Sequence, residues 1–120
     1  METLKLVLKK KWFDMIASGE KTEEYREIKP YWQKRLFCGF CHPYHCPVLS
    51  CEDCYQQYTD SLEDFRKHYE VTFYLGYKKD RPQMTFEIEF LSVDEGKEEW
   101  GAEKGKNYFV IKLGKRIDNL

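Results

Sequence analysis

The residues best suited to chemistry lie between Gly19 and Arg26, in a G-x-K-x-x-E-x-R arrangement. Glu24 and Arg26 are two positions apart, which places both on one face of a strand. In a partly dry pocket Arg26 would keep Glu24 ionised, and Lys21 would lose basicity beside Arg26. Lys21 and Glu24 would then be candidate catalytic residues, with Glu24 a general base and Lys21 a nucleophile or proton carrier. The same residues could instead bind a ligand, with the two cations on a phosphate and Glu24 on a base edge.

The charge content of this stretch limits where its strand can lie. Charged and hydroxylated side chains dominate residues 20–26, so the strand cannot be a central core strand. It is either a solvated edge, whose ion pairs contribute little to stability, or the lining of a polar pocket.

A second group of reactive side chains is confined to one segment. All five cysteines fall between Cys38 and Cys54. Two C-x-x-C pairs can surround tetrahedral Zn²⁺, and a local cluster of this kind favours structural zinc over a disulfide framework. The proposed ligands are Cys38, Cys41, Cys51 and Cys54, with His42, His45 and Cys46 as alternatives and free thiols as the other reading. The order of the motifs argues against a catalytic deaminase zinc, because the H-x-E at His68 follows both pairs and neither pair follows a proline.

The totals are those of one globular domain spanning residues 1–120, with a cysteine-rich insertion at 38–58. The chain has 42% hydrophobic and 34% charged residues and a net charge of −1. That charge is too low for a protein that wraps duplex nucleic acid, so any nucleic-acid contact must be a local basic patch. No apolar run approaches the roughly 18 residues that span a bilayer, so we expect no membrane partner and a cytoplasmic protein.

Periodicity predicts an α+β fold with about five strands, mainly antiparallel, and two or three short helices. Apolar alternation with a period of two predicts strands at 4–8, 71–75, 84–90 and 108–113, and the motif itself predicts one at 22–27. Helical spacing predicts helices at 12–18, ending at Gly19, and at 31–37 after Pro30, and a third is expected from residue 60 or 61 through His68. These elements suit a small, partly closed β-barrel with helices packed on it.

Aromatic residues make up 17% of the chain and divide into two groups. Those that fit an apolar period are expected in the core: Trp12, Phe73, Phe86, Phe90 and Phe109. Trp32, Tyr77 and Trp100 are less constrained, and stacking on a ligand is open to them. Lys9 to Lys11 and His68 are expected to be solvated, the lysines at an element boundary and His68 on a helix.

The G-x-K-x-x-E-x-R motif after a strand and a helix resembles the signature of the ASCH (activating signal cointegrator homology) domain family of the PUA-like superfamily. Further segments are similar to that family: Phe73 to Gly76, Arg81 to Met84, Glu99 to Ala102 and Tyr108 to Gly114. The resemblance covers residues 4–36 and 71–113 and implies a PUA-like barrel whose cleft holds the motif and binds RNA.

One branch of the family hydrolyses the acetyl amide of N4-acetylcytidine, with a lysine and a threonine of this motif and a later glutamate. Lys21 matches that lysine, whereas Glu24 stands at the position of the threonine. Glu98 and Glu99 are the candidates for the later glutamate. The departure at Glu24 weakens the hydrolase reading.

The leading prediction is therefore binding of RNA or a modified nucleoside by Lys21, Glu24, Arg26 and Trp100. The alternatives are a small amidohydrolase of acylated nucleosides that uses Lys21 and Glu24, and a protein-interaction module that uses the cysteine-rich segment.

Overall fold

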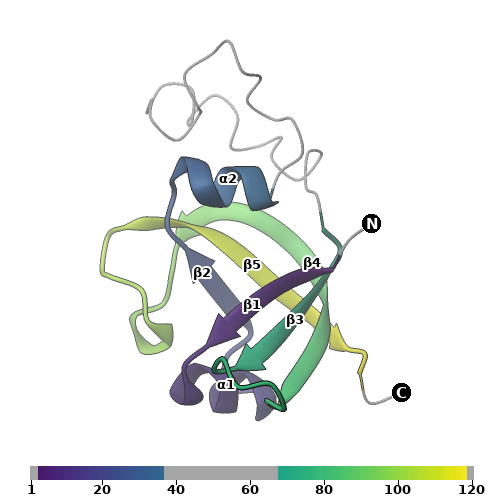
Figure 1. Cartoon of the computed structure of the whole chain (residues 1–120). Coiled ribbons are helices and arrows are strands. Elements are labelled where there is room, and N and C mark those ends of the chain that lie inside the picture. Colours follow the sequence, from purple (N-terminus) through teal and green to yellow (C-terminus); the bar gives the residue numbers. More distant parts are fainter. Residues whose placement is uncertain (1–2, 37–67, 119–120) are drawn as a thin grey trace.

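The computed structural model describes residues 3–36 and 68–118, which form a small α+β domain (Figure 1). Its five strands form one curled mixed sheet in the order β1-β3-β4-β5-β2. The bounds are β1 Leu4–Leu8, β2 Glu23–Arg26, β3 Glu70–Leu75, β4 Gln83–Glu95 and β5 Asn107–Arg116. Only the pairing of β1 with β3 is parallel, and the other three pairings are antiparallel. The sheet curls into a half-barrel with β1 and β2 as its two edges, which confirms the predicted class and strand number.

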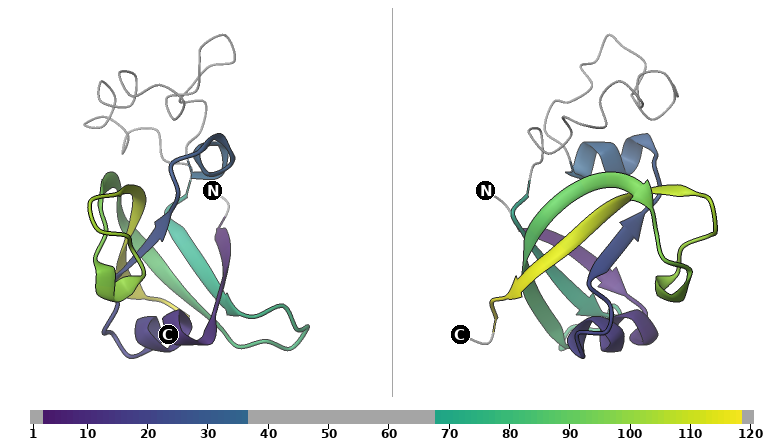
Figure 2. Two further views of the ribbon diagram at one scale, coloured as in Figure 1. Left: turned by 90° about the vertical axis from the view of Figure 1, so that its left-hand side faces the viewer. Right: turned by 180° about the vertical axis from the view of Figure 1, so that it is seen from behind.

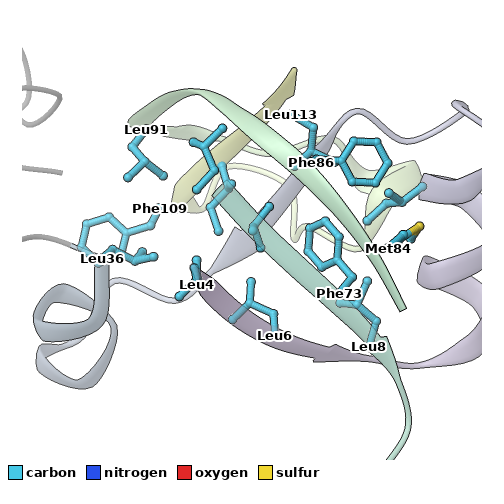
Figure 3. Close-up of a cluster of buried hydrophobic side chains, with 14 of the residues drawn as sticks. Leu4, Leu6, Leu8, Leu36, Phe73, Met84, Phe86, Leu91, Phe109 and Leu113 are labelled. Carbon is cyan, nitrogen blue, oxygen red and sulfur yellow. The ribbon is translucent and has the colours of Figure 1, made fainter. Parts of the chain in front are cut away.

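The half-barrel is filled by side chains from the inner faces of the strands (Figure 3). In β1 the alternating residues Leu4, Leu6 and Leu8 are buried, as the period-two pattern predicts. Phe73 and Phe109, from β3 and β5, are at most 1% exposed and belong to the same cluster. The core predictions for Phe73, Phe86 and Phe109 are thus confirmed.

The long strand β4 departs from the predicted pattern near its middle. Its pairing with β5 shifts register between Phe86 and Ile88 and again between Ile88 and Phe90. Such irregularities bend a strand and change which side chains face inward. Leu91 therefore enters the core at 1% exposure, whereas Phe90 is 46% exposed, and the prediction that Phe90 is a core residue is wrong.

Short helices close the two ends of the half-barrel (Figures 1 and 2). The α1 helix, Lys10–Ala17, buries Phe13 and Ile16 and lies at one end. The α2 helix, Pro30–Leu36, begins at its proline and lies at the other end, with Leu36 fully buried. A 3₁₀ helix, η3, spans Glu98–Trp100. No helix within residues 3–36 and 68–118 is long and apolar enough to cross a bilayer.

His68 differs from its predicted surroundings. It lies outside any helix, is 5% exposed, and its Nε2 is 2.9 Å from the backbone oxygen of Arg35. The contact joins the end of α2 to a residue two positions before β3, and a partner so distant in the chain leaves no local signal. The prediction of a solvated helical histidine is wrong, and the rest of that predicted helix lies outside the described residues.

Candidate ligand-binding site

A cavity of about 470 Å³ lies between the two edge strands of the sheet. Its walls come from the end of β1 and the start of α1, from β2 and the residues after it, and from the segment between β4 and β5. The lining residues are Val7, Leu8, Lys9, Trp12, Lys21, Glu24, Tyr25, Arg26, Glu27, Lys29, Trp32, Trp100, Gly101, Glu103, Lys106 and Tyr108. The four residues predicted to bind a ligand, Lys21, Glu24, Arg26 and Trp100, all line this one cavity. The motif strand is both an edge strand and a pocket wall.

Lys21 is directed inward by the turn that ends α1. Ser18 continues the helix by donating its N–H to Asp14 O, and Gly19 then takes a positive φ of 87°, which L-residues rarely adopt. After this turn the Lys21 N–H donates to Met15 O at 3.0 Å. The backbone is thereby fixed on both sides of Lys21, and its side chain is only 1% exposed.

Lys21 and Glu24 form a buried ion pair. Lys21 Nζ donates to Glu24 Oε1 at 2.7 Å, and the same oxygen accepts the Tyr25 N–H at 3.0 Å. Burial lowers the pKa of Lys21 and nearby Arg26 lowers it further, while Glu24 acts in the opposite direction. The loss of basicity predicted for Lys21 is confirmed in direction, with burial as its main cause.

The second oxygen of Glu24 is the unusual atom of the site. Glu24 Oε2 is buried, and among residues 3–36 and 68–118 it is the one buried side-chain oxygen or nitrogen without a hydrogen-bond partner. Arg26 Nη1 is the cation facing it, at 3.6 Å, which is too far for a hydrogen bond. An acceptor of this kind has unused capacity for an N–H or O–H donor.

Arg26 is held in place at the rim of the cavity. Its Nη1 donates to Tyr25 O at 2.7 Å, and its guanidinium lies 5.1 Å from the centre of the Trp32 ring. The Arg35 guanidinium also lies near that ring, at 5.2 Å. Trp32 is thus a half-buried aromatic wall bordered by two cations, and ligand contact at its ring stays a prediction.

The opposite wall is the segment between β4 and β5, which is tied to β2 through Tyr25. The Tyr25 hydroxyl donates to Glu23 Oε1 at 2.8 Å and accepts the Lys97 N–H at 3.0 Å. The Tyr108 hydroxyl accepts the Glu103 N–H at 2.9 Å, and the two tyrosine rings are 5.7 Å apart. These contacts hold the wall against the motif strand.

Trp12, from α1, and Trp100, from η3, both line the cavity. Trp12 is half-buried, and the centre of its ring lies 4.7 Å from Lys21 Nζ. The ring therefore covers the buried cation instead of filling the main core. The core prediction for Trp12 is therefore wrong, because this part of the α1 face meets the cavity. Trp100 is 9% exposed and packs with Tyr25 and Tyr108 in a second apolar cluster.

Several lining residues were missed by sequence reasoning. Five basic residues line the cavity, Lys9, Lys21, Arg26, Lys29 and Lys106, against three acidic ones, Glu24, Glu27 and Glu103, so the lining carries a net charge of about +2. Glu27 and Lys29 directly follow the motif and could have been found by extending it. Glu103 and Lys106 come from an irregular segment without periodicity, which gives no sequence signal.

Other candidates lie elsewhere. Glu98 and Glu99 are exposed on η3 and do not line the cavity, and Tyr77 is 84% exposed on the turn between β3 and β4. The proposed zinc ligands Cys38, Cys41, Cys51 and Cys54, and the alternatives His42, His45 and Cys46, lie outside the described residues. Within residues 3–36 and 68–118 no cluster of three or more His, Cys, Asp or Glu side chains is arranged to hold a metal ion.

Comparison with known proteins provides no further assignment. No protein-family model, curated protein or solved structure matches this chain.

Proposed function

We propose that the cavity binds a base of RNA or a modified nucleoside. The observation that carries the proposal is the combination, in one cavity, of aromatic faces, a positive rim and a buried acceptor at Glu24 Oε2. Aromatic side chains beside cations are the usual means of holding unpaired bases and their phosphates. The cavity volume falls within the roughly 300–1,000 Å³ of small-molecule sites.

Each part of the base and its sugar phosphate has a counterpart in this arrangement. The half-buried ring of Trp32 offers a stacking surface for a planar ligand, Trp100 supplies the edge of a buried aromatic cluster to the same cavity, and Glu24 Oε2 can accept a base N–H. Arg26 and Lys29 are suited to a phosphate, Arg26 through a bidentate contact. The proposal includes the ASCH-like, PUA-like assignment, supported by the motif and the half-barrel, and structural zinc in segment 38–58, supported by the spacing of its cysteines.

We expect Arg26→Ala to weaken binding by about ten- to a hundredfold, since a charged hydrogen bond contributes about 1.5–3 kcal/mol. Quenching of tryptophan fluorescence by cytidine monophosphate, N4-acetylcytidine and a short single-stranded RNA measures this directly, because three tryptophans line the cavity. Arg116→Ala is the matched control, since Arg116 pairs with Asp118 outside the cavity lining. Absence of quenching by all three probes, or equal losses in the two variants, would refute the proposal.

A second candidate function is hydrolysis of an acylated nucleoside, and the lowered pKa of Lys21 favours it. An amine with reduced basicity beside a carboxylate is suited to accept and donate a proton during catalysis. If the protein is this hydrolase, it will release acetate from N4-acetylcytidine, and Lys21→Met will abolish turnover. The change in ultraviolet absorbance on deacetylation gives the rate. Binding of N4-acetylcytidine without turnover at high protein concentration would exclude the hydrolase and leave the binding function intact.

A further inference from the structure

The turn between β3 and β4 carries an exposed aromatic ring and two lysines that do not line the cavity. Tyr77 is 84% exposed, and Lys78 and Lys79 beside it are exposed as well. In the left view of Figure 2 this turn projects beyond the sheet at the α1 end of the domain. An exposed aromatic ring next to two cations is the combination with which proteins bind single-stranded nucleic acid.

The base of the turn is fixed although its tip is exposed. The Arg81 guanidinium lies 4.1 Å from the centre of the Tyr74 ring, and its Nη1 donates to Gly76 O at 2.8 Å. Across the turn the Leu75 N–H donates to Pro82 O at 3.0 Å. Arg81 is thus engaged within the turn, and these contacts fix the backbone at its base, which lowers the backbone entropy that a contact at the tip would cost.

This turn adjoins the cavity through the end of β1. The Gly76 N–H donates to Leu8 O at 3.4 Å, and both Leu8 and the exposed Lys9 line the cavity. Lys10 and Lys11 follow, and their charge is offset only in part, because Lys10 pairs with Asp14 at 2.6 Å. Residues 9–14 and 76–82 contain two acidic side chains, Asp14 and Asp80, against six basic ones.

We propose that residues 76–82, together with Lys9 and Lys11, form a track for the chain of a single-stranded nucleic acid whose base occupies the cavity. The lysines contact successive phosphates and Tyr77 stacks on an unpaired base outside the cavity. The inference rests on the proposed function, and it deepens that function by assigning the ligand as a polynucleotide instead of a free nucleoside. A free nucleoside in the cavity would not contact residues 76–82, because none of them lines it.

The test uses a fluorescein-labelled single-stranded RNA of mixed sequence, about 12 nucleotides long, with anisotropy as the readout. The double variant Lys78→Ala/Lys79→Ala is expected to bind about tenfold more weakly, and its slope of log K against log salt is expected to fall by about 1.4, or 0.7 per phosphate contact. Tyr77→Ala is expected to lose at least about fivefold in affinity, and Tyr77→Phe to retain it. Lys112→Ala/Lys115→Ala, on β5 and outside the cavity lining, is the charge-matched control.

The possible failures are distinguishable. Quenching by cytidine monophosphate should be unchanged in the turn variants, since none of their residues lines the cavity. The track is refuted, and the cavity function stands, if wild-type protein binds the RNA no more tightly than it binds cytidine monophosphate. The same conclusion follows if Lys78→Ala/Lys79→Ala and Lys112→Ala/Lys115→Ala weaken RNA binding equally. If neither probe binds, both proposals fail. Polyglutamate is a further competitor. If it displaces the RNA equally well from wild type and from Tyr77→Ala, the track is also refuted, because the surface would then bind any acidic partner without specificity.

Discussion

Replacing Glu24 with alanine is expected to lower the free energy of unfolding by about 3–5 kcal/mol, because it leaves the Lys21 ammonium buried without its partner. Lys21 and Glu24 are 1% and 5% exposed, so water from the adjoining cavity replaces the lost contact only in part. Domains of this size have total stabilities of about 5–15 kcal/mol, and the variant would therefore retain only part of its stability. Urea unfolding followed by circular dichroism gives the value.

Two controls isolate the buried charge as the cause. Asp14→Ala removes an exposed partner from Lys10, at 2.6 Å, and should change stability by less than about 1 kcal/mol. Lys21→Met/Glu24→Leu removes both charges and should recover most of the loss, since apolar side chains of similar size often replace a buried pair without cost. A loss below about 1 kcal/mol for Glu24→Ala would contradict the buried pair.

The free energy of unfolding of Glu24→Ala should depend on pH in a definite direction. The pKa of Lys21 is lowered in the folded protein, so the unfolded state binds more protons above the folded pKa and stability rises with pH up to about 10.5. Loss of Glu24 removes the group that opposes this shift and lowers the folded pKa further. The difference in the free energy of unfolding between wild type and Glu24→Ala is therefore expected to become smaller as pH rises from 7 to 10.

Replacing Gly101 with alanine is expected to cost more than the same change at Gly105, by about 1–3 kcal/mol. Both glycines have positive φ, 102° and 75°, so both substitutions strain the backbone. A Cβ at Gly101, however, would lie 3.0 Å from Cζ2 of Trp12, whereas at Gly105 it would meet no atom within 4 Å. The Trp12 ring would have to move, and it covers Lys21.

This comparison also reports on the cavity. Displacement of Trp12 should weaken nucleotide binding in Gly101→Ala, because the Trp12 ring lines the cavity and covers Lys21. Gly105→Ala should bind as wild type does once its stability is accounted for. Equal unfolding energies and equal affinities for the two variants would show that the close approach of Gly101 to Trp12 is unimportant.

The sequence predicted most of the elements because period-two alternation and the glycine after α1 are local signals. The exceptions have a physical origin in partners that lie far along the chain. Phe90 and Leu91 exchange places because of register shifts against β5, and the alternation within β4 itself contains no sign of them. Trp12 fits a helical apolar face, yet that face is wider than the part that meets the core.

The candidate site was predictable to a similar degree. The spacing of the motif placed Glu24 and Arg26 on one wall, and the lowered pKa of Lys21 was predicted in direction, although burial is its main cause and Arg26 a smaller one. The opposite wall is held by contacts such as the one between the Tyr25 hydroxyl and the Lys97 N–H. Residues so far apart in sequence meet only when the sheet has curled, so spacing could not reveal them.

The pairing of β2 with β5 also determines when this site can exist during synthesis. The motif is made early, but its strand is hydrogen-bonded to β5, with Glu24 opposite Ile111, and residues 27–106 must be closed into a loop before the two strands meet. On the ribosome the motif therefore emerges long before its partner, and contacts of this sequence separation form slowly. A chain that stops before residue 107 would carry the whole G-x-K-x-x-E-x-R motif and still lack the cavity.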